Sequence, residues 1–262
     1  MDILKKSLAP ITKEAWEAIE EQTRDVFKTN LTARKIVDID GPKGIDYGAV
    51  STGKLIIPES QPNNLSYGIN QVQPLIETRN LFSLNIWELD NASRGAVDIN
   101  LDNLIEAAKK MAEFEEKVIY YGLKEAGIHG IVNSSENTIK KPQDLEDLPR
   151  IIAEALDIFK INGIEGPFSL IINPKDWNDF FDSSRGYPLN QRVGEMISGQ
   201  FILAPYVSDM LLVSKRGGDM RMTIGQDLSI GYNSHDTKNV ELFLTESFTF
   251  QVYEPNSFIV IN

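Results

Sequence analysis

The amino-acid sequence predicts an α+β fold, with long helices in some segments and strands in others. Apolar residues recur at three- and four-residue steps over 11–31, 101–126 and 148–160, which is the spacing of one helix face. Residues 220–262 read instead as a succession of strands, in which apolar residues share one alternating phase. The length of 262 residues allows one large domain or two of ordinary size.

Charge and composition exclude several classes of protein. With Lys+Arg 26 against Asp+Glu 38 the net charge is -12, which argues against a protein that wraps nucleic acid on a basic face. Cys 0 excludes disulfides, thiolate zinc sites, iron–sulfur clusters and cysteine nucleophiles. The first residues lack the apolar run of a signal peptide, and no window approaches the ~18 consecutive apolar residues of a membrane helix. We therefore expect a soluble, cytoplasmic protein with no nucleic-acid or membrane partner.

Residues 11–31 are predicted to form an amphipathic helix. Its first turns are rich in glutamate, which the helix dipole favours at an N-terminus. Its apolar stripe consists of Trp16, Ile19, Thr23, Val26, Phe27 and Leu31. Because the next segment is extended and polar, the stripe either packs on its own domain or forms an interface with a subunit or a ligand.

Residues 41–73 contain many glycines, prolines and asparagines, with short β-prone runs such as 54–57 between them. This pattern predicts a long β-hairpin with an extended loop. Such a hairpin cannot bury its own faces, so the pattern indicates that a partner covers it.

The middle of the chain continues with a strand and the longest helix. Residues 74–91 alternate over their centre and predict a strand that includes Trp87. The helix over 101–126 is roughly 40 Å long at ~1.5 Å per residue, and Gly127 is expected to end it.

Residues 144–220 then alternate between helices and strands. Helices are predicted over 148–160, after Asn173-Pro174 and over 188–198, and strands over 168–172, 200–204 and 209–215. In the C-terminal strands, Glu246 interrupts the apolar phase. A buried carboxylate requires a partner, so we expect Glu246 at an interface or a wet edge.

Two enzyme patterns match only in part. Residues 48–54 fit G-x-x-x-x-G-K, but Leu55 stands where a Ser or Thr must reach magnesium, and no helix follows. Ser51 and Lys54 have the spacing of an acylating serine pair but lack its partner motifs. We therefore expect no catalytic residues.

The sequence contains no recognisable metal-binding motif either. Neither His129 nor His235 belongs to a Glu-x-x-His motif, and both are expected in loops. The run Glu113, Glu115 and Glu116 is expected on a solvated helix face. We therefore expect no metal site, and the unpartnered arm, hairpin and long helix favour an assembly protein.

Several stretches resemble the encapsulins, the shell proteins of bacterial and archaeal nanocompartments. They are SLAPIT at 7–12, ARKIVD at 33–38 followed by Gly41-Pro42, PLIETR at 74–79, LNIWELDN at 84–91, GIEGP at 163–167, RGGD at 216–219, GQDLSIGY at 225–232 and TESFTFQ at 245–251. The stretches run through the chain in unbroken order, and the ordered set is more specific than any one motif. The chain looks like the first encapsulin family, which has no inserted nucleotide-binding domain.

The resemblance implies the Hong Kong 97 phage major capsid-like fold. Its parts would be an N-terminal helical arm (1–40), an extended loop (41–73), a spine-helix or peripheral domain in two pieces (74–135 and 221–262) and an axial domain (136–220). It also implies self-assembly into a closed icosahedral shell of about sixty subunits. The chief alternative is a major capsid protein of a phage or prophage, and a second is an enzyme.

The resemblance further implies that the shell encloses a cargo enzyme, for iron storage or oxidative-stress defence. Ferritin-like proteins and dye-decolourising peroxidases are the expected cargo. The C-terminal peptide of the cargo is expected in a groove formed by Phe27, Leu31, Arg34, Ile36, Asp38, Leu228, Ile230 and Tyr232. Two charges among apolar anchors would suit an apolar and basic peptide.

Two more sites follow from the same resemblance. The shell requires no cofactor, but FMN or another flavin is expected to stack on Trp87 near Arg79 on the outer surface. A pore on the five-fold axis is expected to be lined by Asp182, Ser183, Ser184, Arg185, Gly186 and Tyr187. In that pore Arg185 would favour anions, whereas Asp182 would favour cations.

Overall fold

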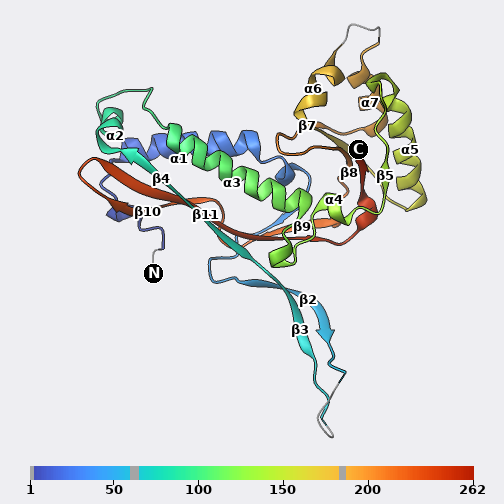
Figure 1. Ribbon diagram of the computed structural model, residues 1–262, viewed down its shortest axis with the longest axis horizontal. Coiled ribbons are helices and arrows are strands. Elements are labelled where there is room, and N and C mark those ends of the chain that lie inside the picture. The colour runs from blue at the N-terminus through green and yellow to red at the C-terminus, as the bar shows by residue number, and fades with distance from the viewer. Residues whose placement is uncertain (1–2, 60–64, 183–186) are drawn as a thin grey trace.

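The computed structural model describes residues 3–59, 65–182 and 187–262, and it shows two β-sheets, packed helices and a projecting hairpin (Figure 1). The helices are α1 (Lys13–Asn30), α2 (Ile86–Ser93), α3 (Asp102–Tyr121), α4 (Ile131–Ser134), α5 (Leu148–Ile161), α6 (Pro174–Phe181) and α7 (Leu189–Ile197). The strands are β1 (Asp38–Asp40), β2 (Ala49–Ile56), β3 (Ile69–Pro74), β4 (Ile76–Asn85), β5 (Thr138–Ile139), β6 (Phe168–Ile172), β7 (Phe201–Leu203), β8 (Met210–Ser214), β9 (Met220–Ile224), β10 (Ser229–His235), β11 (Asn239–Val252) and β12 (Phe258–Ile261). This mixture of helices and sheets confirms the predicted α+β class.

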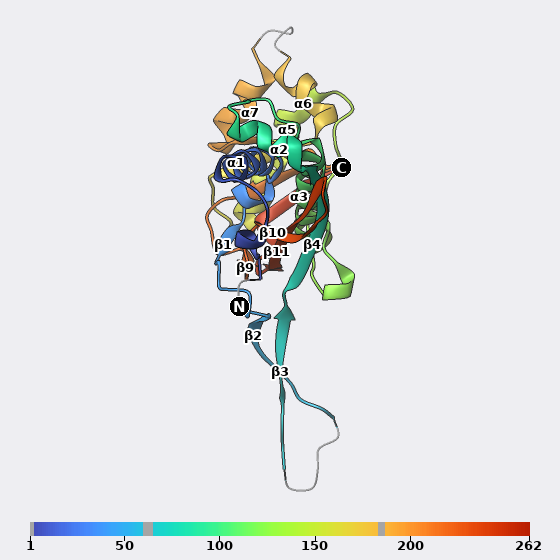
Figure 2. The same ribbon diagram turned by 90° about the vertical axis from the view of Figure 1, so that its left-hand side faces the viewer.

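The long strand β11 organises the first sheet, whose order is β1-β9-β11-β10, with β4 also paired to β11. β4 runs antiparallel to β11 from Asn239, opposite Asn85, to Phe248, opposite Ile76. β9 then pairs with the rest of β11, from Phe248 to Val252. α3 packs on β4 and β11, and α1 packs on α3 (Figures 1 and 2).

The residues on one face of β11 contribute to two different apolar cores. Val240, Leu242 and Leu244 pack with α1 and the first half of α3. Phe248 and Phe250 pack instead with the end of α3 and with residues of both sheets. The predicted phase of this strand is therefore confirmed. The stripe of α1 is buried within its own domain, as the first of the two interpretations predicted.

Charged residues lie on β11 and α3 between these two cores. The Arg34 guanidinium donates to both carboxylate oxygens of Glu115, at 2.8 and 2.7 Å. It also donates to Glu246 at 2.5 Å and to Asp227 at 3.0 Å. Together Arg34, Glu115, Asp227 and Glu246 form what we call the Arg34 cluster. The expectation that Glu246 lies at an interface or a wet edge is wrong. Its side chain is buried inside the chain, and its partner is Arg34, which lies 212 positions away in the sequence.

Burial disfavours the charged forms of Glu246 and Arg34. The Glu115 and Glu246 side chains are each 1% exposed. Burial raises the pKa of Glu246 well above its ordinary value, and the nearby Glu115 charge adds to this, whereas Arg34 opposes it. Burial works against the charge of Arg34, but hydrogen bonds and charges from the carboxylates raise its pKa, so the guanidinium stays protonated.

Glu116, the next residue on α3, holds the chain that follows α1. It accepts hydrogen bonds from the backbone amides of Thr32 and Ala33, both at 2.7 Å, and from the Thr32 hydroxyl. Burial raises the pKa of Glu116 to about 7, although these hydrogen bonds act in the opposite direction. The prediction of a solvated face for Glu113, Glu115 and Glu116 is therefore wrong for the last two, because α3 is covered both by α1 and its following turn and by the first sheet.

The predicted end of the long helix lies at another residue, and α7 ends at a residue other than glycine. α3 ends at Gly122, whose φ of 84° allows the turn, and is about 30 Å long. Gly127 ends only the short 3-10 turn at 124–126. Ala126 in that turn continues the apolar stripe of α3, which is why the predicted helix was too long. At the end of α7 the left-handed residue is Ser198. Gly199 comes next, and no larger residue fits there, because a Cβ would lie 1.8 Å from the carbonyl oxygen of Phe168.

The predicted strand over 74–91 is a strand followed by a helix. Asn85 caps α2, because its side chain accepts a hydrogen bond from the amide of Glu88 at 3.1 Å. Trp87 therefore lies in the first turn of a helix and not on a strand.

The second sheet has the order β5-β12-β8-β6-β7. One of its faces packs against α5, α6 and α7, while the other shares the core at the end of α3. The C-terminal strand β12 lies between β5 and β8. Residues 258–261 thus belong to the sheet of the expected axial domain, although 221–262 was assigned to the peripheral domain. The other domain boundaries stay predictions.

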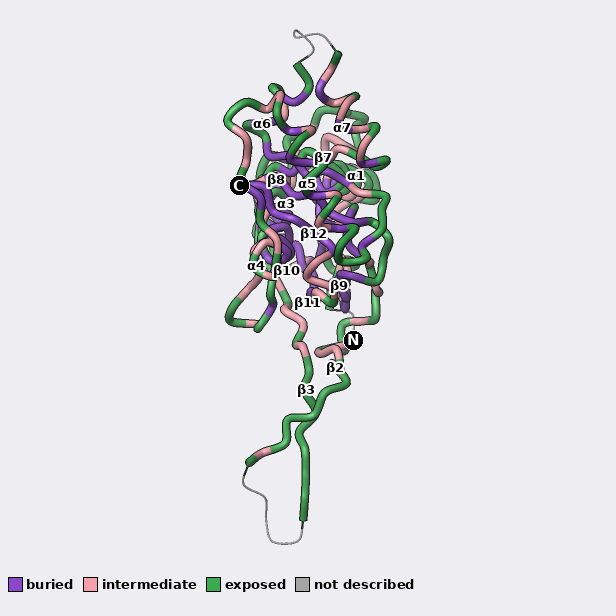
Figure 3. Tube along the Cα trace, turned by 90° about the vertical axis from the view of Figure 1, so that its right-hand side faces the viewer, coloured by how far each residue is buried: buried purple, intermediate pink, exposed green. Residues whose placement is uncertain are grey.

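The hairpin β2–β3 projects from the body and is largely exposed (Figure 3). Its exposed apolar side chains are Leu55, Ile56, Ile57, Leu65, Tyr67, Ile69 and Val72. At its base the side chain of Gln73 donates to the carbonyl of Ala126 at 2.9 Å. Among the described residues, no helix has both the length and the apolar character needed to cross a membrane.

Glu116→Gln tests the effect of the buried carboxyl on stability. The folded-state pKa of about 7 lies above the ordinary 4.5, so the folded chain retains a proton that the unfolded chain has lost. The free energy of unfolding therefore falls as the pH rises from 4.5 to 7, by about 3 kcal/mol. Glutamine keeps an oxygen for the amides of Thr32 and Ala33 but does not titrate. We expect the variant to gain stability over wild type as the pH rises, measured by denaturant unfolding at about pH 5 and about pH 8.

Glu113→Gln is the matched control, because this carboxylate is solvent-accessible and pairs with Lys117 at 2.6 Å. It is expected to follow the wild-type pH profile. Parallel profiles for wild type and Glu116→Gln would contradict the assignment of this titration to Glu116.

Candidate functional site

A groove of about 700 Å³ lies beside α1. Its walls are α1, the N-terminal turn that contains Lys6, the connection from α1 to β1, and the segment 227–230 at the start of β10. Its volume lies within the range of about 300–1,000 Å³ that is usual for ligand pockets.

The floor of the groove is apolar. Phe27 and Leu31 lie one turn apart on the α1 stripe, and both are nearly buried. Ile230 is buried on the opposite wall, and Leu228 beside it is half-buried. With Arg34, these four residues are the part of the predicted cargo-peptide set that lines the groove.

The other three predicted residues lie elsewhere. Ile36 is buried in the core at the end of α3. Asp38 in β1 accepts a hydrogen bond from the amide of Gly218 at 2.6 Å. The Tyr232 hydroxyl forms a 2.6 Å hydrogen bond with Nδ1 of His235. None of the three is among the residues that line the groove.

A row of charges on α1 was missed by the sequence prediction. Glu20, Arg24 and Lys28 follow one another at four-residue steps and form the outer rim of the groove. The row lies next to Thr23, Phe27 and Leu31, which is the row that forms the floor. Helix periodicity could have identified it, because each member of this row lies three positions before a member of the floor row and is therefore its neighbour on the helix surface.

The two residues of the expected flavin site lie on different elements, and flavin binding stays a prediction. Trp87 is 74% exposed on α2. Arg79 lies on β4, and its guanidinium stacks on the ring of Phe243 at 4.3 Å. The strand from Arg79 to Asn85, the residue that caps α2, spans about 20 Å at ~3.3 Å per residue. The side chains of Arg79 and Trp87 are therefore far apart within one chain.

Only the ends of the expected pore loop can be placed. Asp182 follows α6, and the Tyr187 hydroxyl donates to Glu195 at 2.7 Å. Ser183, Ser184, Arg185 and Gly186 lie outside the described residues, so the pore stays a prediction.

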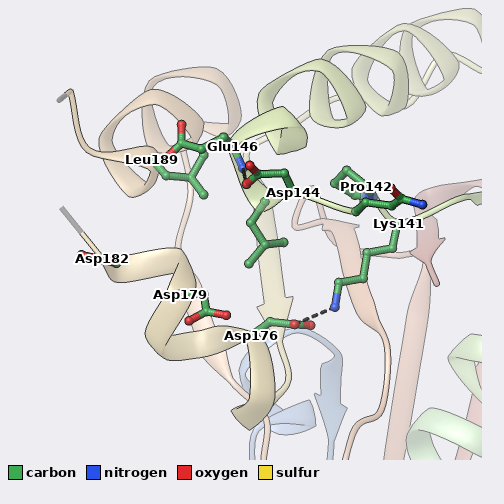
Figure 4. Close-up of a pocket in the computed structure, with 10 residues that line it drawn as sticks. Lys141, Pro142, Asp144, Glu146, Asp176, Asp179, Asp182 and Leu189 are labelled. Atoms are coloured by element: carbon green, nitrogen blue, oxygen red, sulfur yellow. Dashed lines mark hydrogen bonds and ion pairs between the residues drawn. The ribbon is translucent and has the colours of Figure 1, made fainter. Parts of the chain in front are cut away.

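An acidic pocket of about 460 Å³ lies beside α6 (Figure 4). It lies between the segment 141–146 and α6, and Asp144, Glu146, Asp179 and Asp182 contribute to its lining. Lys141 Nζ lies 2.6 Å from Asp176 Oδ1 and neutralises part of this charge. Within residues 3–59, 65–182 and 187–262, no group of three or more histidine and carboxylate side chains is arranged to hold a metal ion.

Sequence comparison relates nearly the whole chain to one family. Residues 1–249 match a family described as an encapsulating protein for peroxidase. A type 1 encapsulin shell protein of Rhodospirillum rubrum is 37% identical, over 98% of this chain and 95% of the relative. Its counterpart in Brevibacterium linens is 39% identical over 95% of each chain. The one in Mycobacterium tuberculosis is 33% identical over the full length of both.

Solved structures share the fold at low sequence identity. A virus-like particle from Pyrococcus furiosus has a TM-score of 0.69 and 18% identity, and the match covers 94% of this chain and 99% of that one. The capsid of the myovirus XM1 has a TM-score of 0.55 and 13% identity, over 88% and 91% of the two chains. These likenesses confirm the phage capsid-like fold, and the sequence relatives decide between a phage capsid protein and an encapsulin. The chain belongs to the family of the type 1 encapsulin shell proteins.

Proposed function

We propose that about sixty copies of this chain form a closed icosahedral shell in the cytoplasm, and that the shell encloses a cargo enzyme. The cargo is held by its C-terminal peptide, which lies in the groove beside α1. The chain itself acts as a structural protein, and the cargo supplies the chemistry of iron storage or oxidative-stress defence. The observation that carries the proposal is an open, preformed groove on a member of a shell-protein family.

The hairpin supports the assembly part of the proposal. Its apolar side chains are 46–70% exposed in the single chain, and contiguous exposed apolar surface of this kind marks an interface. Members of closed homo-oligomers bury such elements against neighbouring copies. The single chain is therefore incomplete without its neighbours.

The groove supports the cargo part. Phe27 and Leu31 provide apolar surface at helical spacing, and Leu228 and Ile230 face them from the first sheet. A short peptide gains affinity in such a groove from two or three apolar anchors. The family match to an encapsulating protein for peroxidase makes a peroxidase one candidate cargo, beside a ferritin-like protein.

Charges on the hairpin test assembly. Ile56 and Ile69 face each other across the two strands and are 54% and 55% exposed. We expect wild type to form closed hollow particles free of nucleic acid, seen by electron microscopy. Ile56→Asp with Ile69→Asp should reduce particle yield on the order of tenfold or more, because buried charges weaken every contact. The secondary structure by circular dichroism should be retained.

Val97→Asp is the control for assembly, because this residue is 99% exposed in a turn outside the hairpin. It should form particles like wild type. Elution of wild type as a monomer or small oligomer at neutral pH would overturn the shell proposal.

Leu228→Ser tests docking in the groove. Phe27 is only 8% exposed and belongs to the core, so a charge there would disturb folding, whereas Leu228 is half-buried. We expect Leu228→Ser shells to form normally but to retain about tenfold less cargo, since the peptide loses one apolar anchor. The measurement is mass spectrometry of the protease-protected contents of shells from the native host. Val97→Ser is the control and should retain as much cargo as wild type. If Leu228→Ser shells also retain as much cargo as wild type, the cargo peptide does not dock in the groove.

We further propose that Trp87 is the stacking platform for a flavin, with Arg79 supplied by a neighbouring subunit. An indole that is 74% exposed is available for stacking. Wild-type shells incubated with FMN should stay yellow after dialysis, and Trp87→Ala should bind about tenfold more weakly. Trp87→Phe, which keeps a ring, should be intermediate. Colourless wild-type shells would end this proposal.

A further inference from the structure

The chain passes three times between the part that holds the first sheet and the part that holds the second sheet. Residues 135–137 lead from α4, which packs on α3, to β5; residues 215–219 lead from β8 to β9; and residues 253–257 lead from β11 to β12. The two parts also share the apolar core at the end of α3. Apolar contacts are non-directional, whereas hydrogen bonds depend on angle, so polar contacts at these crossings specify the angle between the parts most narrowly.

Hydrogen bonds join the three crossings to one another. The backbone carbonyl of Asp219 accepts from the amides of Tyr253 and Glu254, at 2.8 and 3.2 Å. The side-chain amide of Asn137 donates to the side-chain oxygen of Asn256 at 2.9 Å. The second crossing is therefore tied to the third, and the third is tied to the first.

The turn between β8 and β9 extends these contacts to both parts. The Arg216 guanidinium donates from Nε and Nη2 to the Asp219 carboxylate, at 2.9 and 2.8 Å, and from Nη1 to the carbonyl of Gly163 at 3.0 Å. Gly163 lies just after α5, which packs on the second sheet. The amide of Gly218 donates at 2.6 Å to Asp38 of β1, in the first sheet. One short turn thus holds an element of each part.

The angle between the two parts matters for assembly. The hairpin β2–β3 projects from the side of the first sheet, away from α6 and α7, which pack on the second sheet (Figures 1 and 2). A closed shell has more than one kind of rotation axis, so each copy needs contact surfaces on more than one side, and the angle between these surfaces decides whether the copies close. A change in the angle between the two parts therefore changes the diameter of the particle or prevents its closure.

We propose that Arg216 is a positioning residue for assembly, which fixes the angle between the two sheets, and thereby the size of the shell, by holding Asp219 and the carbonyl of Gly163. The inference rests on the proposed shell function and adds the residue that sets the geometry of the subunit. Arginine suits this role, because its planar guanidinium binds a carboxylate through two nitrogens and keeps a third for a carbonyl, whereas a lysine ammonium acts as a point charge. The Asp219 side chain that it binds is only 8% exposed.

Arg216→Gln tests this role through particle size. Wild type should give one particle diameter by negative-stain electron microscopy and one mass by mass photometry. The variant should fold, as judged by circular dichroism, but its share of particles outside the wild-type diameter should rise on the order of tenfold, because hydrogen bonds to a charged group are lost. Arg216→Lys, which keeps the charge but not the planar fork, should lie between the two. A residue that merely stabilises the chain would lower the unfolding temperature and the yield without changing the diameter.

Arg192→Gln is the matched control. Arg192 pairs with Glu146 at 2.8 Å, and its side chain is 36% exposed, against 30% for Arg216. Arg192 lies on α7 and Glu146 in the 3-10 turn before α5, so both belong to the part that holds the second sheet. This variant removes an equal charge without touching the crossings, and it should form particles of the wild-type diameter.

A distance measurement reports the angle directly. The sequence has Cys 0, so Val97→Cys and Ile161→Cys provide two specific labelling sites, at residues that are 99% and 84% exposed on opposite sides of the crossings. Spin labels are attached there, and labelled copies are diluted with unlabelled copies in the shell. The distribution of distances between the two labels should be narrow with Arg216 in place and broader in Arg216→Gln.

The outcomes separate this inference from the shell proposal. If wild type forms no closed particles, both fail. If Arg216→Gln particles keep the wild-type diameter and a narrow distance distribution, the positioning role is overturned and the shell proposal stands. If the variant folds but forms no particles, a broader distribution in the unassembled chain supports the role, and an equally narrow one overturns it. If neither Arg216 variant folds while Arg192→Gln does, Arg216 is a folding residue and the inference fails.

Discussion

The rest of the structure depends on the contact between Arg34 and three carboxylates. It joins the chain after α1, the middle of α3, the turn before β10 and the strand β11 at a point between two apolar cores. Removing one member of a buried ion cluster leaves its partners uncompensated and typically costs about 3–5 kcal/mol. The cluster therefore locks the connection after α1 in one position. Since that connection is the end wall of the groove, the groove is preformed before any occupant arrives.

Two surfaces of the chain lack partners within it, and they serve different purposes. The hairpin presents exposed apolar residues that a neighbouring copy would cover in a shell, so we expect the stability of the chain to depend on its assembly. The groove is lined by charged as well as apolar residues and stays open in the single chain. The capsid of the myovirus XM1 shares the fold at 13% sequence identity, and a shared fold by itself does not determine function.

Local sequence patterns predicted the elements that local forces define. The stripe of α1, the hairpin and the apolar phase of β11 were predictable because periodicity within one element reports which face is buried. The partner of Glu246 was not predictable, because Arg34 lies 212 positions away and only the fold brings the two together. Glu115 and Glu116 were misassigned for a related reason, because α3 is covered both by α1 with its following turn and by the first sheet. Five of the eight predicted cargo-peptide residues line the groove, but the row of charged residues on its rim was missed beside the apolar floor.

Cryo-electron microscopy of shells that contain cargo tests the central claim most directly. The account predicts a closed icosahedral particle in which the groove beside α1 faces the interior. It also predicts density for a short peptide between Phe27 and Leu228, with the hairpin covered by neighbouring subunits. A particle in which the groove faces outward, or is filled by a neighbouring subunit while cargo density contacts another surface, would contradict the account.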